Sequence, residues 1–273
     1  MKEAEESLFD DEVRVCLPPS DSVNRAAFED GVREKLIWLR QRLSELGSVA
    51  QIAYHDHKPV AFIEYVSAKY APVPFADEGK TALVTCLYKP SYKEKGVGSA
   101  LLKATLGRLR ALGASEVKVL VGRKKEWIHG ELFLKHGFRV ERTLYKPGRT
   151  EPLDMLTYDL TGARRTVGDA STIRFESALS DSLPVHVVCF GSGQCPFGAL
   201  VRGRLRAAVA RFDSRFVVLE EMDTWENCRL ARECGAMYGD IFINGRTPFL
   251  GPASQEQIEQ EISKEIERIK ALG

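Results

Sequence analysis

The residues best suited to chemistry lie at 93–99, where the sequence is Lys-Glu-Lys-Gly-Val-Gly-Ser. Glycine has no Cβ, so a ligand can approach the backbone closely there. If a helix begins at this turn, its first N–H groups have no partner within the helix, and its dipole favours negative charge. We therefore expect a pyrophosphate to bind at Lys93, Glu94, Lys95, Gly96, Val97, Gly98 and Ser99.

The segments on either side are expected to position this turn. Residues 81–88 are rich in β-branched and aromatic side chains, which is typical of a strand. From Ser99 onward, leucines recur at the spacing of one helical stripe, at Leu102, Leu106 and Leu109. Gly113 is placed to end this helix.

A Gly-x-Gly turn alone does not identify its ligand. A Walker loop requires Gly-Lys followed by Ser or Thr four residues after its first glycine, and none follows this turn. A dinucleotide-binding fingerprint requires a third glycine where this chain has Leu101. The flanking sequence must therefore decide between the remaining classes of site.

The turn resembles the acetyl-CoA loop of the GNAT acyltransferases, [Gln/Arg]-x-x-Gly-x-[Gly/Ala], with Lys93 in the first position. Residues 127–140 are similar to the second GNAT signature, a helix that ends in Gly137-Phe138 before another strand. The resemblance implies a GNAT fold of the α/β (α+β) class with acetyl-CoA as co-substrate. It also implies that Leu87 and Tyr88 hold the pantetheine arm.

Further stretches resemble one branch of this family, the YoaP-like acetyltransferases. They are Glu64-Tyr65-Val66, Lys69-Tyr70-Ala71-Pro72, Cys86-Leu87-Tyr88, Trp127 and the residues 133–138. The acceptors of this branch do not follow from these residues.

Acylation of an amine needs a base, or a path through water, for the amine proton and an acid for the leaving CoA thiolate. Many GNAT enzymes use a tyrosine as this acid, at the position held here by Phe133, which cannot donate a proton. By position, Tyr88 or Cys86 replaces it, and Glu64 on the neighbouring strand is the candidate base. Two alternatives stay open: Cys86 as a small core residue, and Glu64 on a solvated face.

The second half of the chain predicts a separate domain. We place the GNAT domain at residues 1–162, a polar linker with an entering strand at 163–183, and the second domain at 184–273. Strand-like, helical and turn segments alternate in this last part in the order β-α-β-α-β-β-α. Its last helix is expected from Ser254 to Leu272, with one stripe of isoleucines.

This order resembles the thioredoxin fold, as do Cys195-Pro196 before a helix and Thr247-Pro248 before an edge strand. A thiol at a helix N-terminus is expected to have a lowered pKa, so Cys195 is the candidate reactive thiol. Pro248 would follow a cis peptide bond beside it. Gly198 stands where a resolving cysteine would be, which favours a monothiol role or a domain used only for contacts or dimerisation.

The composition of the chain limits which partners, cellular location and metal sites we expect. The chain has 273 residues, 44% of them hydrophobic, and a net charge of +1, which gives no reason to expect nucleic acid or an anionic membrane as partner. No apolar run is long enough to span a membrane, the start of the chain is acidic, and the six cysteines form no Cys-x-x-Cys, so we expect a cytoplasmic protein without a metal site. The pair His55 and His57 lacks a third ligand at suitable spacing and is assigned to an exposed turn.

The leading hypothesis is acetyl transfer from acetyl-CoA to an amine of a small molecule or peptide. The alternative is an inactive acyl-CoA-binding module whose thioredoxin-like domain contacts a partner or carries monothiol redox chemistry. Phe133 is the main support for this alternative. A homodimer is compatible with both hypotheses.

Overall fold

The computed structural model describes residues 1–17, 28–73, 80–88, 96–123, 128, 130–146, 151–162, 171–175, 181–236, 239–249 and 252–272. Its strands are β1 (Lys2–Glu3), β2 (Ala50–His55), β3 (Lys58–Ser67), β4 (Thr81–Tyr88), β5 (Glu116–Gly122), β6 (Arg139–Tyr145), β7 (Leu153–Asp159), β8 (Ser171–Arg174), β9 (Val185–Gly191), β10 (Val217–Asp223) and β11 (Asp240–Ile243). Its helices are η1 (Glu6–Leu8), α1 (Phe9–Cys16), α2 (Glu29–Leu46), η3 (Ala68–Tyr70), α3 (Val97–Ala111), α4 (Gly130–Lys135), α5 (Phe197–Val209), α6 (Cys228–Cys234) and α7 (Gln255–Lys270). None of these helices is long and apolar enough to cross a bilayer.

The first unit is built on an eight-stranded sheet in the order β1-β2-β3-β4-β5-β7-β6-β8. Neighbouring strands are antiparallel except for β4 with β5 and β6 with β8. The parallel pairing of β4 and β5 joins only residues 81–84 to residues 116–119. Residues 85–88 of β4, which the sequence places beside the glycine turn, are therefore not paired with β5.

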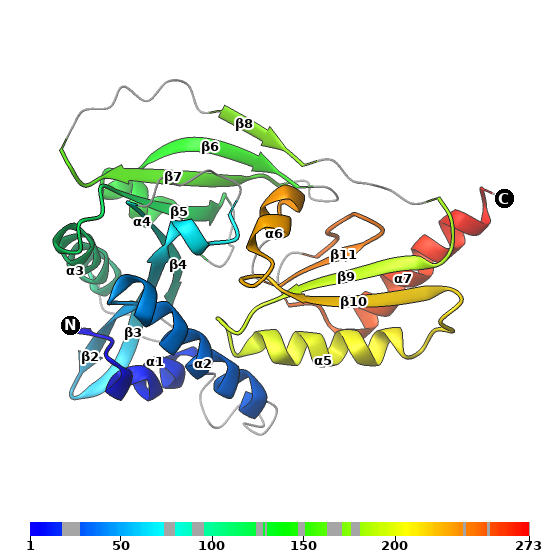
Figure 1. Cartoon of the computed structure of the whole chain (residues 1–273), viewed down its shortest axis with the longest axis horizontal. Coiled ribbons are helices and arrows are strands. Elements are labelled where there is room, and N and C mark those ends of the chain that lie inside the picture. Colours follow the sequence, from blue (N-terminus) through cyan, green and yellow to red (C-terminus); the bar gives the residue numbers. More distant parts are fainter. Residues whose placement is uncertain are drawn as a thin grey trace.

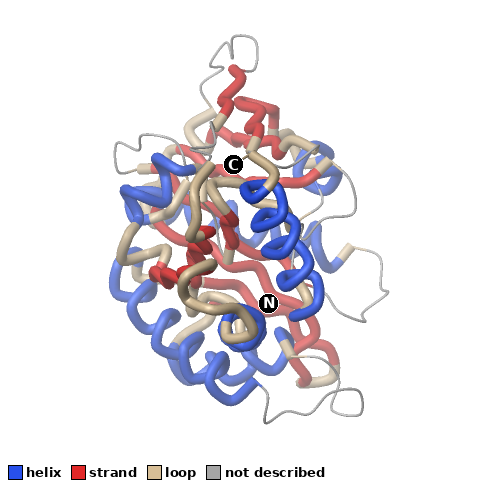
Figure 2. The backbone as a smooth tube through the Cα atoms, turned by 90° about the vertical axis from the view of Figure 1, so that its right-hand side faces the viewer, coloured by secondary structure: helices blue, strands red, loops and turns tan. Residues whose placement is uncertain are grey.

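Two apolar clusters cover the two faces of this sheet. One includes side chains of α1 and α2, and the other includes those of α3 and α4. Figure 1 shows α1 and α2 on one side and α3 on the other, and in the view turned by 90° helices flank the central strands (Figure 2). Tyr88 packs on the α1/α2 face, whereas Leu87, the next residue along β4, packs on the α3 face.

The sequence predicted much of this unit. The strand at residues 81–88 has the predicted bounds, and the hairpin of β2 and β3 turns at Asp56 and His57, which both have positive φ. Apolar residues at helical spacing predict a helix over residues 21–46, and the structure describes it from Glu29 to Leu46, with Gly47 in the left-handed region as its end. Ile37, which this spacing places among the apolar contacts of the helix, is 49% exposed, and helix α1 was not predicted.

The second unit has a three-stranded sheet in the order β10-β9-β11, with β9 and β10 parallel. Helices α5 and α7 pack on one face, and the side chains of α6 belong to a smaller cluster that includes Phe190 and Phe242. Helix α7 begins with a capping box of Ser254 and Gln257. Its isoleucines form the predicted buried stripe, Ile258, Ile262, Ile266 and Ile269.

Two expectations for this half need correction. The hairpin after β11 is reduced to one isolated bridge, Ile243 with Arg246, in the part of the chain that the structure describes. The cis bond predicted before Pro248 is wrong, because Leu183–Pro184 is the one cis peptide among the described residues. Trans is the more stable form of an X–Pro bond by about 0.5–1 kcal/mol, unless the surrounding fold selects cis.

The strand expected near residues 172–175 exists as β8, but it pairs with β6. The first sheet therefore extends past residue 162. Residues 163–170 and 176–180, the rest of the expected linker, lie outside the described residues.

The two units pack closely against each other. Trp225, after β10, belongs to the apolar cluster of the first unit and lies edge-on to Trp38 of α2, with ring centroids 5.3 Å apart. Arg232 of α6 donates to the backbone carbonyls of Lys69 (2.7 Å) and Ala71 (2.9 Å), and the side chains of Lys146 and Asp240 form a buried ion pair. Because both units contribute to one buried cluster, the second unit forms part of the first unit's core.

Candidate active site

The three predicted catalytic residues lie on one face of the sheet. Glu64 of β3 is directly opposite Cys86 of β4, and Phe62 is opposite Tyr88. The register shifts after Glu64, because Tyr65 pairs with Val84, so Thr85 is the extra residue of a β-bulge. The bulge places Cys86 and Tyr88 on the α1/α2 face together with Glu64.

Glu64 is 1% exposed, so the alternative of a solvated face is wrong. Its carboxylate is in contact with Lys35 Nζ, and Lys35 Nζ also lies 3.1 Å from Glu12 Oε1. The ammonium lies over the rings of Trp38 and Phe62, at 5.7 and 5.5 Å from their centroids. One buried cation thus faces two buried carboxyl groups and two aromatic faces.

The charges of this cluster determine where its protons reside. Burial raises the pKa of Glu12 well above its usual value, and the charge of Glu64 and a hydrogen bond with it add to the effect, although Lys35 opposes it. Burial alone would lower the pKa of Lys35, but Cys16, Glu64 and Glu12 raise it well above its usual value. The cluster therefore consists of an ammonium ion that faces two buried carboxyl groups, and of these Glu12 has a raised pKa.

The loop before α5 brings the second unit into the same cluster. The backbone carbonyl of Gln194 accepts a hydrogen bond from Lys35 Nζ at 2.9 Å, and Gln194 Nε2 donates to Glu64 Oε2 at 3.1 Å. Gln194 is 5% exposed, and its Oε1 has no hydrogen-bond partner among the described residues. The next residue is Cys195, which is half-buried at this seam between the units.

The setting of Cys195 differs from the expectation in one respect. The backbone N–H groups of Phe197 and Gly198 act to lower the pKa of its thiol, as a position before a helix predicts, although Gly198 N–H donates to the Cys195 carbonyl oxygen at 2.8 Å. Burial nevertheless outweighs these two effects and raises the pKa of the thiol. The expectation of a lowered pKa was therefore wrong, because the second unit is packed against the first at this point.

Burial also raises the pKa of Cys86 well above its usual value, and it raises the pKa of Tyr88. Both groups therefore hold their protons at neutral pH. Either can donate a proton, as the sequence required of the group that replaces the usual tyrosine. Cys86 also contributes to the buried apolar cluster, so its role as a core residue is compatible with the structure.

The usual position of the acid is Phe133, which is fully buried on the other face of the sheet. Its ring lies edge-on to Phe138 at 5.2 Å and belongs to the cluster beneath α3 and α4. This residue serves packing alone, as expected for a phenyl group without a proton to donate.

The glycine turn leads into α3. Gly96 has φ 106°, a left-handed conformation that favours glycine, and no described atom lies within 4 Å of the position of an added Cβ. A Cβ on Gly98 would lie 3.3 Å from Leu132 Cδ2. Val97, Gly98 and Ser99 form the first turn of the helix, where N–H groups have no partner within the helix. Lys93, Glu94 and Lys95 lie outside the described residues.

A metal site finds no support in the part of the chain that the structure describes, because no group of three His, Cys, Asp or Glu side chains there is arranged to hold an ion. His55 and His57 lie at the exposed turn between β2 and β3. The predicted assignment of this pair to a turn is confirmed.

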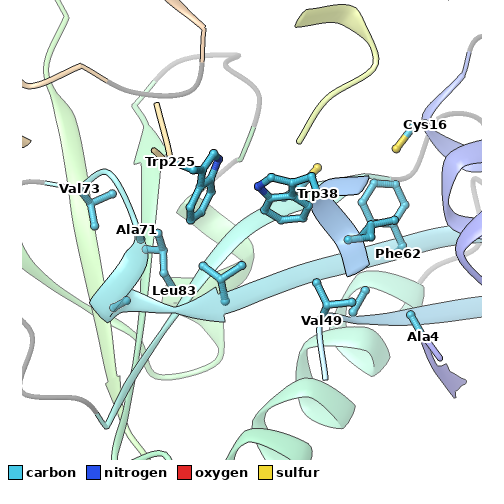
Figure 3. Close-up of a cluster of buried hydrophobic side chains, with 14 of the residues drawn as sticks. Ala4, Cys16, Trp38, Val49, Phe62, Ala71, Val73, Leu83 and Trp225 are labelled. Atoms are coloured by element: carbon cyan, nitrogen blue, oxygen red, sulfur yellow. The ribbon is translucent and has the colours of Figure 1, made fainter. Parts of the chain in front are cut away.

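Three members of the charged cluster were not identified from the sequence. Glu12, Lys35 and Gln194 come from α1, α2 and the loop before α5, and no common motif links them. Figure 3 shows the surroundings of the cluster, with Cys16, Phe62 and Trp38 over the same strands and Trp225 on the far side of Trp38. A polar residue at an apolar position of an amphipathic helix, such as Lys35 near Trp38 and Leu39, was the one available signal.

Comparison with known proteins agrees with the GNAT interpretation for the first half of the chain. Residues 12–138 match the model of the acetyltransferase (GNAT) family. These residues include Glu12, Lys35, Glu64, Cys86 and Tyr88. The chain thus carries a GNAT acetyltransferase domain at residues 12–138.

Several solved structures are similar to the chain. An N-acetyltransferase from Staphylococcus aureus Mu50 aligns with 58% of this chain and 96% of its own, at 14% identity and a TM-score of 0.43. A ribosomal-protein-alanine N-acetyltransferase from Brucella melitensis aligns with 58% of this chain and 98% of its own, at 14% identity and a TM-score of 0.44. The PaiA N-acetyltransferase of Thermoplasma acidophilum, solved with coenzyme A, aligns with 58% of this chain and 96% of its own, at 18% identity and a TM-score of 0.40. No curated protein sequence matches the chain significantly.

Proposed function

We propose that the chain transfers an acetyl group from acetyl-CoA to an amine of a small molecule or peptide. The main observation is that Glu64, Cys86 and Tyr88 converge on one sheet face within residues 12–138, the part that matches the acetyltransferase family. A buried carboxylate beside protonated donors is the combination that proton transfer to and from an acyl-transfer centre requires.

The co-substrate would bind between β4 and the start of α3. The backbone N–H groups of Val97, Gly98 and Ser99 would hold the pyrophosphate, and Leu87 and Tyr88 would border the pantetheine arm. The left-handed Gly96 supports this assignment, because it turns the chain into the helix without a side chain in the way. Lys93, Glu94 and Lys95 would complete the loop.

In the reaction, Glu64 accepts the proton of the amine directly or through water, and the amine nitrogen attacks the thioester carbonyl. Tyr88 donates a proton to the leaving CoA thiolate, and Cys86 is the second candidate for this role. The raised pKa of Tyr88 supports it as the acid, because the phenol stays protonated at neutral pH.

We assign the second unit to a thioredoxin-like domain and the whole chain to the YoaP-like branch. The order β9-α5-β10-α6-β11-α7 and Cys195-Pro196 at the start of α5 support the first assignment. All six cysteines are free thiols, which supports the cytoplasm as the location. The inactive acyl-CoA-binding module is retained as the competing function, with Phe133 as its support.

The test is calorimetric titration of acetyl-CoA and CoA into the full chain, followed by release of CoA with a panel of polyamines, amino acids and lysine peptides. We expect saturable binding that Gly98→Leu abolishes, because its side chain would meet Leu132 and fill the turn. Gly107→Ala, on the same helix with no described atom within 4 Å, is the matched control and should bind normally. Binding without turnover of any amine would favour the inactive module, and absence of binding would refute the proposal.

A further inference from the structure

We propose that Cys195 is an acetyl carrier, which takes the acetyl group from acetyl-CoA as a thioester and passes it to the amine. The inference rests on the proposed function and gives a reason for the fusion of the two units. It assigns a covalent modification site to the second unit, next to the residue that contacts Lys35 and Glu64.

The second unit is docked tightly against the helix that carries Lys35. A Cβ added to Gly31 would overlap the backbone of Pro196, and one added to Gly193 would lie 3.0 Å from the backbone oxygen of Glu34. The carboxylate of Glu34 also accepts hydrogen bonds from Arg202 Nη2. These contacts fix the loop of residues 193–196 against α2.

This docking brings the thiol to the catalytic groups. The residue before it, Gln194, bonds Lys35 through its carbonyl and Glu64 through its amide, and Glu64 lies opposite Cys86 on β4. Cys195, the next residue, lies on the loop that these two hydrogen bonds hold against Lys35 and Glu64. The second unit therefore places a thiol next to the residue that contacts Lys35 and Glu64.

Other features of the seam suit a transferred acyl group. Cys16 and Cys86 are buried, whereas Cys195 is partly exposed, so an amine from solvent can reach a thioester at this position. The backbone N–H of Phe197 acts on its sulfur and would stabilise the thiolate as it forms and leaves. The buried Gln194 Oε1 lacks a partner among the described residues, as expected where a polar ligand is missing.

The transfer has two steps. In the first, Cys195 Sγ attacks the carbonyl carbon of acetyl-CoA, a new C–S bond forms, and the bond to the CoA sulfur breaks. Glu64 accepts the thiol proton and Tyr88 protonates the CoA thiolate, after which the proton on Glu64 returns to Tyr88 through water. In the second, the amine nitrogen attacks the Cys195 thioester, the amide forms, and the proton lost by the amine passes to the departing Cys195 thiolate.

The experiment mixes the full chain with acetyl-CoA alone in a quenched-flow instrument, and measures CoA release by chromatography and acetylated peptides by mass spectrometry. We expect a burst of one CoA per chain and an acetyl group on the peptide of Cys195 that neutral hydroxylamine removes. The Cys195→Ser variant should show neither the burst of CoA nor the acetylated peptide. Cys234→Ser, which changes another partly exposed thiol of the second unit, should keep both.

Three outcomes separate the possibilities. If the wild-type chain binds acetyl-CoA and acetylates an amine while Cys195 stays unmodified, the carrier is refuted and the proposed function stands. If calorimetry detects no binding of acetyl-CoA, both the carrier and the proposed function are refuted. The wild-type peptide map decides the question even if Cys195→Ser does not fold, because it identifies the acetylated side chain directly.

Discussion

Lys35 of α2 donates a hydrogen bond from Nζ to the backbone carbonyl of Gln194, 2.9 Å away in the other unit. The same ammonium contacts the carboxyl groups of Glu12 and Glu64. The charge balance of the candidate active site therefore depends on a loop that lies outside the GNAT match. One partner of the central cation of the site thus comes from outside residues 12–138.

The first prediction concerns this cation. Lys35→Met leaves two buried carboxyl groups without their counter-charge, so we expect a loss of about 3–5 kcal/mol in the free energy of unfolding. Urea denaturation followed by circular dichroism measures it. Arg33→Met removes an exposed ion pair of the same helix and should cost about 0–1 kcal/mol. Equal midpoints for the two variants would show that the cluster is not held by Lys35.

The second prediction follows from the raised pKa of Glu12. In the pH range above the usual glutamate pKa of about 4.3, the folded chain keeps a proton on Glu12 that the unfolded chain has lost. Its stabilising contribution is complete below that value and is lost as pH rises toward the raised pKa. Glu12→Gln keeps a hydrogen-bonding side chain that does not titrate.

We therefore expect the stability of the wild-type chain to fall more steeply between about pH 5 and 8 than that of Glu12→Gln. Urea midpoints measured at several pH values compare the two. The exposed Glu5→Gln is the control and should follow the wild-type curve. Parallel curves for the wild type and Glu12→Gln would mean that Glu12 is already ionised in the fold.

Local sequence signals predicted the elements that carry their own pattern. The strand at residues 81–88 has β-branched and aromatic side chains throughout, and α7 has both a capping box and a complete isoleucine stripe. By contrast, α1 begins among acidic residues and is only eight residues long. This helix was missed because it is too short to show a clear apolar stripe, and its buried side chains pack against other segments of the chain.

The candidate site was predicted in part for the same reason. Glu64, Cys86 and Tyr88 lie on adjacent strands, so a correct hairpin and strand placed them together. Their partners Lys35 and Gln194 are 159 residues apart and meet only because the two units dock. No periodicity along the chain predicts that contact. The raised pKa of Cys195 was missed for the same reason, because it results from burial between the two units.

The third prediction tests the acid. Tyr88→Phe removes the hydroxyl group and keeps the ring that packs at 6.2 Å from Phe62. We expect kcat to fall by roughly a hundredfold or more with any amine that turns over, because general acid catalysis is lost. The affinity for acetyl-CoA measured by calorimetry should not change. Tyr158→Phe, at the packing contact with Phe138, is the control with full activity. Unchanged kcat in Tyr88→Phe would transfer the role to Cys86.

The last prediction concerns Trp225, which is 8% exposed in the apolar cluster of the first unit, where its Nε1 donates to Ser192 Oγ at 3.0 Å (Figure 3). Trp225→Ala creates a cavity between the units, so we expect a loss of about 3–5 kcal/mol. Leu230→Ala, at a side chain of α6 that is 39% exposed, should change stability by less than about 0.5 kcal/mol.

The same variant tests whether the two units unfold together. Because Trp225 completes a core that includes Trp38, the wild-type chain should unfold in one transition, with coincident far-ultraviolet and near-ultraviolet circular dichroism. In Trp225→Ala the two curves should separate, since the second unit loses its apolar contact with Trp38. A double-mutant cycle with Trp38→Ala should give a coupling of about 0.5–1.5 kcal/mol, as found for aromatic pairs. Two separate transitions already present in the wild-type chain would show that the contact between Trp38 and Trp225 does not join the units into one cooperative fold.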